Sequence, residues 1–200
     1  MPVEMRGAVD LRKALNQFAP DLAKDLSKEI AAVLKPIVKE ARGYVPSSSP
    51  MSGWAVRNPT QARFPFFDSA LIRKGIGYRT TPSKPNPHGF RSLAEINNKT
   101  KIGAIYETAG RKNPTGQPWV GPGKKLKQNK FSHSNNPRAG AKFIENLEPL
   151  EGNGNDRGRL IYKAWQNNGG KAQDAFFKAV NSTIAKFNNR TSTVDIKRAA

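Results

Sequence analysis

The most constraining feature of this sequence is an apolar repeat near its N-terminus. Between residues 11 and 41, apolar side chains recur at spacings of three and four: Leu11, Leu15, Phe18, Leu22, Leu26, Ile30, Val33, Leu34, Ile37, Val38 and Ala41. This spacing places them on one face of an α-helix. Pro20 suits the first turn of a helix, and Pro36 predicts a kink because proline removes one backbone hydrogen bond. We therefore expect a long kinked helix to about Gly43, lying across a sheet or across neighbouring subunits.

A second apolar repeat predicts another helix near the C-terminus. Its apolar residues fall into two groups, Leu160, Ile161, Ala164 and Trp165, then Ala172, Ala175, Phe176, Ala179, Val180, Thr183, Ile184 and Phe187. Asp156 is a candidate N-cap for this helix, and Gly169-Gly170 is a candidate interruption. We expect residues 189–200 to form a flexible tail.

The middle of the chain predicts a small sheet between long loops. Residues 43–67 are rich in Pro, Ser and Gly but include aromatic residues, which predicts a long loop that packs onto the core. We predict two antiparallel strands, over residues 68–82 and 90–100. Residues 101–109 predict a short helix ended by a glycine. Residues 110–156 predict an extended basic and acidic arm or insertion, with one helical turn at most.

Together these elements predict a single α+β domain over residues 1–200. It would contain a long kinked N-terminal amphipathic helix, a small antiparallel sheet, a C-terminal amphipathic helix, and long ordered loops and arms. Hydrophobic residues make up 36% of the 200 residues, below the usual range of roughly 45–50%. Such a chain suits a subunit whose core is completed by its neighbours.

The charge of the chain is strongly positive and unevenly distributed. It carries 34 Lys and Arg against 15 Asp and Glu, a net charge of +19. Residues 108–144 contain eight basic and no acidic side chains, whereas residues 145–156 contain four acidic and no basic ones. This excess favours contact with a polyanion or with an acidic partner surface. A solvated basic face explains it equally well.

The side chains that carry most enzyme chemistry are sparse here. There is no cysteine, and the two histidines, His88 and His133, lie in loop-like segments. Glu107 is an isolated carboxylate, which we expect to pair with a basic residue or a neighbouring subunit rather than to act as a general base. The stretch GQPWVGPGKK lacks the spacing and the final Ser or Thr of a phosphate-binding loop. We therefore expect no catalysis, no cofactor and no metal.

Membrane attachment is not expected either. No apolar run approaches the roughly 18–20 residues that a bilayer-spanning helix needs, and the N-terminus lacks the apolar core of a signal peptide. We expect the protein to be made and assembled in the cytoplasm.

A basic cluster follows the predicted short helix. Its candidate DNA-facing or partner-facing residues are Arg111, Lys112, Lys124, Lys125, Lys127 and Lys130. Trp119 and Phe131 lie nearby, and lysines with aromatic side chains suit nucleic-acid contact. No recognised nucleic-acid-binding motif accompanies them, so a solvated loop or a subunit contact is an equal interpretation.

The order of these elements resembles a known family. A kinked helix ending in EARGYVP is followed by a Pro/Ser/Gly loop, a strand beginning SALIRKGI, a second strand leading into IGAIYETAG, and a closing amphipathic helix. This order resembles the tail-completion proteins of long-tailed bacteriophages, also called neck or tail-to-head joining proteins. Their Y-A-x-x-x-E-x-G type segment is matched here by Gly103, Ala104, Ile105, Tyr106, Glu107 and Gly110.

The resemblance covers residues 8–110 and 157–188, and two departures from it are visible. GAIYE replaces the Tyr-Ala pair, and residues 111–156 are far longer than the loop expected before the last helix. The resemblance implies a homo-oligomeric ring, usually a hexamer, stacked in the virion between the head-side connector and the tail tube. It implies that DNA passes through the lumen and that the motif segment contributes to interfaces. A tail terminator protein and a basic nucleic-acid-binding protein remain as alternatives.

Overall fold

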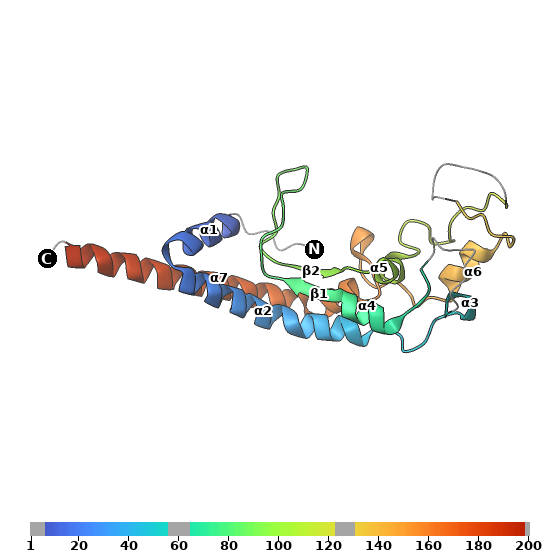
Figure 1. The fold of residues 1–200 in the computed structure, drawn as a ribbon, viewed down its shortest axis with the longest axis horizontal. Helices are drawn as coiled ribbons and strands as arrows, with labels where there is room; N and C mark the ends of the chain where they lie inside the picture. The colour runs from blue at the N-terminus through green and yellow to red at the C-terminus, as the bar shows by residue number, and fades with distance from the viewer. Residues whose placement is uncertain (1–6, 56–64, 123–130, 199–200) are drawn as a thin grey trace. The chain divides into compact units, whose positions relative to one another are not determined.

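The computed structural model describes residues 7–55, 65–122 and 131–198. Along the chain these residues form α1 (Ala8–Phe18), α2 (Pro20–Gly43), α3 (Ser52–Ala55), α4 (Ser69–Gly75), β1 (Ile76–Arg79), β2 (Glu95–Asn98), α5 (Lys101–Thr108), α6 (Ala139–Glu145), a 3₁₀ turn (Gly154–Asp156) and α7 (Ile161–Arg198), as Figure 1 shows. The fold is therefore helical with a small two-stranded antiparallel sheet, β1–β2, which confirms the α+β class. Residues 56–64 and 123–130, within the predicted loop and arm, lie outside the described residues.

The chain divides into two compact units, where sequence analysis treats it as a single domain. The first unit consists of Met1–Lys39, Tyr78–Asn97 and Asn168–Ala200. The second consists of Glu40–Gly77 and Asn98–Asn167. Each unit is thus assembled from segments that are far apart in the sequence.

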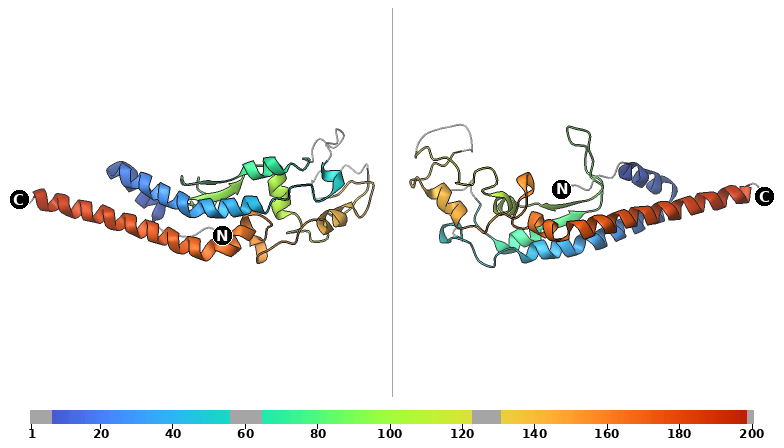
Figure 2. Two further views of the ribbon diagram at one scale, coloured as in Figure 1. Left: turned by 90° about the horizontal axis from the view of Figure 1, so that it is seen from below. Right: turned by 180° about the vertical axis from the view of Figure 1, so that it is seen from behind.

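The core of the first unit lies between α1, α2 and α7. Its buried side chains are Ala8, Leu15, Ala19, Leu22, Ala23, Leu26, Ile30, Leu34, Leu93, Phe176, Ala179 and Val180. Within this unit α2 and α7 run antiparallel, because Lys186 pairs with Glu29 at 3.8 Å and Arg190 pairs with Asp21 at 2.7 Å. The two views in Figure 2 show these helices side by side. The apolar repeats read from the sequence therefore face one another.

The core of the second unit centres on an aromatic cluster. The Trp54 ring packs against Phe67 at 5.2 Å, Phe143 at 4.9 Å and Tyr106 at 6.5 Å between ring centroids. The indole Nε1 donates to the Pro65 carbonyl at 2.9 Å. The predicted loop 43–67 thus packs onto the core through its aromatic residues, and it includes the short helix α3.

The prediction of a strand over residues 68–82 is wrong for its first half. Residues 69–75 form α4, and only Ile76–Arg79 are extended. The Asp68 side chain caps α4 by accepting a hydrogen bond from the Leu71 backbone N–H at 2.8 Å. The second strand is also shorter than predicted, spanning Glu95–Asn98 rather than residues 90–100.

The two long helices agree with the sequence prediction only in part. α2 begins at Pro20 and ends at Gly43, as predicted, but the apolar repeat before Pro20 belongs to the separate helix α1. α2 continues through Pro36, and the kink there stays a prediction. α7 continues through Gly169-Gly170, so the interruption predicted there is wrong. It also continues to Arg198, and the flexibility of residues 189–200 stays a prediction.

Candidate functional site

Helix α5 carries the segment that resembles the phage family, and most of its motif faces the interior of the second unit. The Thr100 hydroxyl caps the helix by accepting a hydrogen bond from the Gly103 N–H at 3.1 Å. Gly103 is required for packing, because a Cβ there would overlap the side-chain amide of Asn98. Ile102 and Tyr106 are buried on the same face. Helix α5 is therefore fixed along one side by close contacts.

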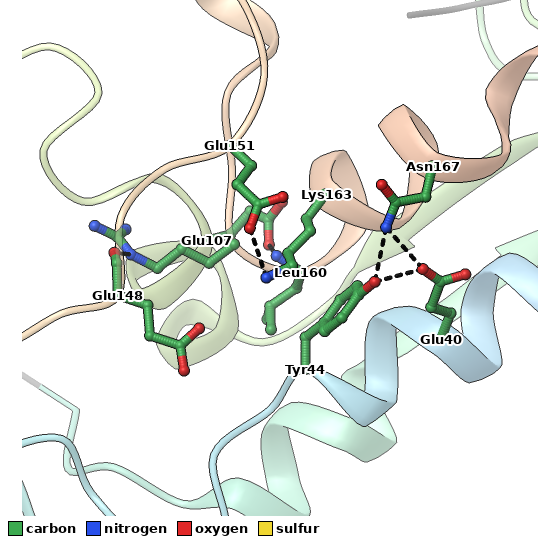
Figure 3. A network of polar contacts seen from close by, with 9 residues as sticks. Glu40, Tyr44, Glu107, Glu148, Glu151, Leu160, Lys163 and Asn167 are labelled. Carbon is green, nitrogen blue, oxygen red and sulfur yellow. Dashed lines mark hydrogen bonds and ion pairs between the residues drawn. The ribbon is translucent and has the colours of Figure 1, made fainter.

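Glu107, the last buried residue of α5, binds the N-terminus of α7. Its carboxylate accepts backbone hydrogen bonds from Leu160 at 2.7 Å, Ile161 at 3.2 Å and Tyr162 at 2.9 Å. Figure 3 shows Glu107 beside Leu160. The first N–H groups of a helix have no intrahelical acceptor, and the helix dipole favours a negative charge there. Glu107 supplies both the acceptor and the negative charge, although it lies more than fifty residues away in the sequence. The N-cap predicted at Asp156 is therefore wrong, since Asp156 lies in the preceding 3₁₀ turn.

Arg159 makes the reciprocal contact at the C-terminus of α5. Its Nη1 donates to the carbonyl oxygens of Tyr106 at 2.9 Å and Ala109 at 2.8 Å, and its Nε donates to the Glu148 carbonyl. The last carbonyls of a helix lack intrahelical donors, and the dipole favours a positive charge there. We call Glu107, Arg159 and the backbone groups that they bind the helix-end joint. Each buried charge in this joint binds the helix end of opposite polarity.

The helix-end joint is almost completely removed from solvent. The exposed fraction of Glu107 is 4% and that of Arg159 is 2%. Burial raises the pKa of Glu107, although the three backbone hydrogen bonds oppose that shift. Burial lowers the pKa of Arg159 and raises the pKa of Tyr106 to about 12. Gly158 lies against the Glu107 carboxylate, where a Cβ would overlap it.

A pair of arginines, Arg111 and Arg157, adjoins the joint. Arg111 donates to the carbonyl of Arg157, and Arg157 donates to the carbonyl of Arg111 at 3.2 Å. The Arg111 guanidinium also lies 4.4 Å from the centroid of the Tyr162 ring. Backbone hydrogen bonds between Glu151 and Gly158, at 2.9 and 3.0 Å, continue the contact. The chain segment between α5 and α7 is thus held together at its base.

The first turns of α7 carry a polar network on their other side. Lys163 pairs with Glu151 at 2.6 Å and lies 4.6 Å from the centroid of the Tyr44 ring. The Tyr44 hydroxyl donates to Glu40, and the Asn167 side chain donates to both, as Figure 3 shows. These contacts connect the end of α2 with the start of α7 inside the second unit.

The structure separates the predicted motif residues into two groups. Gly103, Tyr106 and Glu107 are buried, so they serve the interior of this chain. Ala104 is exposed, and Ile105 and Gly110 are partly exposed. Gly110 has a φ of +84°, the left-handed conformation that ends a helix. Only the second group presents surface that could meet another molecule.

The predicted basic residues do not come together as one described patch. The guanidinium of Arg111 is engaged with Arg157 and Tyr162, while Lys112 is exposed. Lys124, Lys125, Lys127 and Lys130 lie outside the described residues. The predicted arm is partly folded, because it includes α6 and a bridge between Trp119 and Ser132.

The described part of the chain offers no metal centre. Across residues 7–55, 65–122 and 131–198, no group of three or more His, Cys, Asp or Glu side chains is placed to hold an ion. His88 and His133 are both exposed in loops. Over the same residues, no helix has the length and apolarity that crossing a membrane requires.

Comparison with known proteins leaves the chain without a match among protein-family models, curated proteins or solved structures. The function of the chain is therefore inferred from its own residues and from the order of its elements.

Proposed function

We propose that this chain is a structural subunit of the head-to-tail connection in the virion of a long-tailed bacteriophage. Its copies would assemble in the host cytoplasm into a homo-oligomeric ring, expected to be a hexamer. The ring would complete the tail or join it to the head, in contact with neighbouring connector and tail proteins. DNA would pass through its lumen without sequence-specific contacts, and the chain would perform no catalytic step.

The observation that carries this proposal is the helix-end joint within the resembling motif. Glu107 is the motif's only acid, the residue is 4% exposed, and its carboxylate accepts hydrogen bonds from three backbone N–H groups. A general base must reach its substrate, directly or through one water. A buried joint between two helices instead suits a subunit that must keep its shape under load. This favours a structural role for the motif over a catalytic one.

Exposed apolar side chains on the second unit are candidates for contacts in such an assembly. Phe66, Leu71 and Trp119 are each more than 40% exposed. Large exposed apolar side chains are typical of surfaces that contact other proteins when they gather in a patch. Ala104 and Ile105, on the outer side of α5, are the motif residues that could join such contacts.

The proposal is tested first in the particle and then in solution. Peptide mass spectrometry on gradient-purified virions of a phage that encodes this chain should detect it as a stoichiometric component. Native mass spectrometry and negative-stain microscopy of the nuclease-treated full-length protein, alone and in disrupted virions, should show closed rings of about six copies. Absence from purified virions would overturn the structural role, and presence without any annular assembly would overturn the ring.

The charge of the chain supports one other function, that of a basic nucleic-acid-binding protein. A net charge of +19 favours contact with phosphates. Such binding should weaken steeply between about 50 and 200 mM salt. Absence of duplex DNA binding at about 50 mM salt would exclude this alternative. A tail terminator would also form a ring. Labelling this chain in intact virions and locating the label by electron microscopy would distinguish a tail terminator from a neck protein.

A further inference from the structure

The exposed side of α7 in the first unit carries a continuous stripe without charge. Moving along the helix in steps of three and four residues from Gly170, the stripe contains Gly170, Gln173, Phe177, Asn181, Ile184 and Asn188. At about 100° per residue these positions lie within one narrow sector of the helix. Phe177 is 38% exposed and Ile184 is 37% exposed. We call these six residues the uncharged stripe.

The uncharged stripe is distinct from the face that α7 uses inside its own unit. The buried face of α7 consists of the residues that directly precede four members of the stripe, namely Ala172, Phe176, Val180 and Thr183. Between Gly170 and Asn188 no charged residue falls in the sector of the stripe, and Asp174 and Lys178 border its outer edge. A helix with a second, uncharged stripe beside its core face is suited to packing against another helix.

The stripe is complementary to itself when two copies run antiparallel. With Phe177 opposite its counterpart at the centre, Ile184 lies opposite Gly170, and Gln173 lies opposite Asn181. Gly170 has open space where a Cβ would be, so it leaves room for a large side chain. Two amide side chains facing one another can exchange hydrogen bonds. The pattern therefore pairs large with small and polar with polar.

The bordering charges select the same arrangement. In an antiparallel helix pair, the outer edge of one stripe faces the outer edge of the other. Asp174 of one copy then lies opposite position 180 of the other, about two residues, or roughly 3 Å along the axis, from Lys178, and the pair occurs twice. A parallel pair would instead set this charged edge beside the partner's core-facing side. Charge complementarity thus favours a second copy of this chain in the antiparallel direction.

We propose that two copies of this chain associate through the uncharged stripe of α7, antiparallel and centred on Phe177. This contact is isologous and closes after two copies. It does not rest on the proposed ring, which requires a different, head-to-tail contact. If rings form, the same contact would join two of them, because each copy uses its stripe once.

The first test places matched charges inside and outside the stripe of the full-length protein. Sedimentation equilibrium on nuclease-treated protein should show a reversible doubling of mass for the unaltered chain, from one copy to two or, where rings form, from one ring to two. Asn181→Lys and Phe177→Ala should each raise the dimer dissociation constant at least about 30-fold, as expected for central interface positions. Ala175→Lys adds the same charge at an exposed position off the stripe and should leave the constant within about twofold. Equal effects of Asn181→Lys and Ala175→Lys would overturn the proposal.

A mixing experiment separates contacts between copies from contacts within one helix. Asp174→Lys and Lys178→Asp should each weaken self-association, but an equimolar mixture should form a heterodimer more tightly than either variant alone. Charges within each helix remain unfavourable in that mixture, so recovery can come only from the partner. A stripe that binds a different protein, or a chain that stays monomeric at all concentrations, would show no such recovery and would overturn the proposal.

Disulfide trapping determines the direction, since the chain has no native cysteine. Gln173→Cys mixed with Asn181→Cys should form mostly the mixed disulfide if the helices are antiparallel. Predominant Asn181→Cys homodimers would show a parallel pair and would overturn the proposed arrangement.

Discussion

Replacing Glu107 with alanine should remove the acceptor that holds the N-terminus of α7. Three backbone N–H groups lose their partner, of which the one at Leu160 is buried and those at Ile161 and Tyr162 are partly buried. Leaving a buried donor unsatisfied costs about 1–3 kcal/mol, and hydration reduces that cost for partly buried ones. We therefore expect Glu107→Ala to lower the free energy of unfolding by about 3–5 kcal/mol.

The measurement is urea unfolding followed by tryptophan fluorescence. All three tryptophans lie in the second unit, so the signal reports the unit that contains the joint. Glu145→Ala is a matched control, because Glu145 is exposed and its 3.8 Å contact with Arg138 lies at the surface. We expect the control to change stability by no more than about 0.5 kcal/mol. A loss below about 1 kcal/mol for Glu107→Ala would refute the role given to these hydrogen bonds.

The pH dependence of the same site follows from the raised pKa of Glu107. Because the folded-state pKa lies above the unfolded value of about 4.3, the folded protein binds this proton first as pH falls. Wild type should therefore gain stability relative to Glu107→Gln between neutral pH and about pH 4.3, and lose that gain as pH rises through the folded pKa. If the difference between the two proteins moves the other way, the hydrogen bonds outweigh burial and the pKa is lowered.

Three further substitutions test other parts of the second unit by the same assay. Arg159→Met keeps apolar volume but leaves the carbonyls at the end of α5 unsatisfied, so it should cost about 2–4 kcal/mol; a loss below about 1 kcal/mol would contradict this. Gly103→Ala forces a Cβ onto the Asn98 amide and should cost about 1–3 kcal/mol, whereas Gly53→Ala has open space and should be neutral or stabilising. Tyr106→Phe removes a buried hydroxyl with no partner among the described residues, so it should change stability by less than about 1 kcal/mol; a larger loss would show that the hydroxyl is bonded.

Local patterns predicted the long helices because their apolar faces recur at a fixed spacing. α2 begins at Pro20 and ends at Gly43 as expected, since proline in a first turn and glycine at a helix end act within a few residues. The sequence predicts a strand over α4 because Ile72 and Ile76 fall at a spacing that both a helix and a strand allow. The deciding signal is Asp68, the N-cap of α4, whose side chain accepts a hydrogen bond from the backbone N–H three residues later. A search for caps before short apolar runs would have found it.

The helix-end joint could not be predicted from spacing. Glu107 looked isolated because its partners are backbone groups 53 to 55 residues away, and backbone groups leave no trace in a residue pattern. Arg159 is one of 34 basic residues, and composition and spacing do not distinguish it from the others, although it is 2% exposed. The sequence does carry one weak signal, because Gly158 and Arg159 immediately precede the apolar repeat that becomes α7. That signal becomes informative only once tertiary contacts bring α5 to the same place.

The helix-end joint also helps to explain why the segment between α5 and α7 can be longer than the phage family pattern has it. Arg111 and Arg157 exchange hydrogen bonds at its base, directly beside Glu107 and Arg159. Once the base of a loop is fixed, doubling the loop's length adds only about 0.6 kcal/mol of closure cost. The extra length of residues 111–156 is therefore compatible with the order of helices on which the resemblance rests. A chain without Glu107 or Arg159 would depart from the resemblance more seriously than a chain with a longer loop, because it would lack the contacts that bring α5 and α7 together.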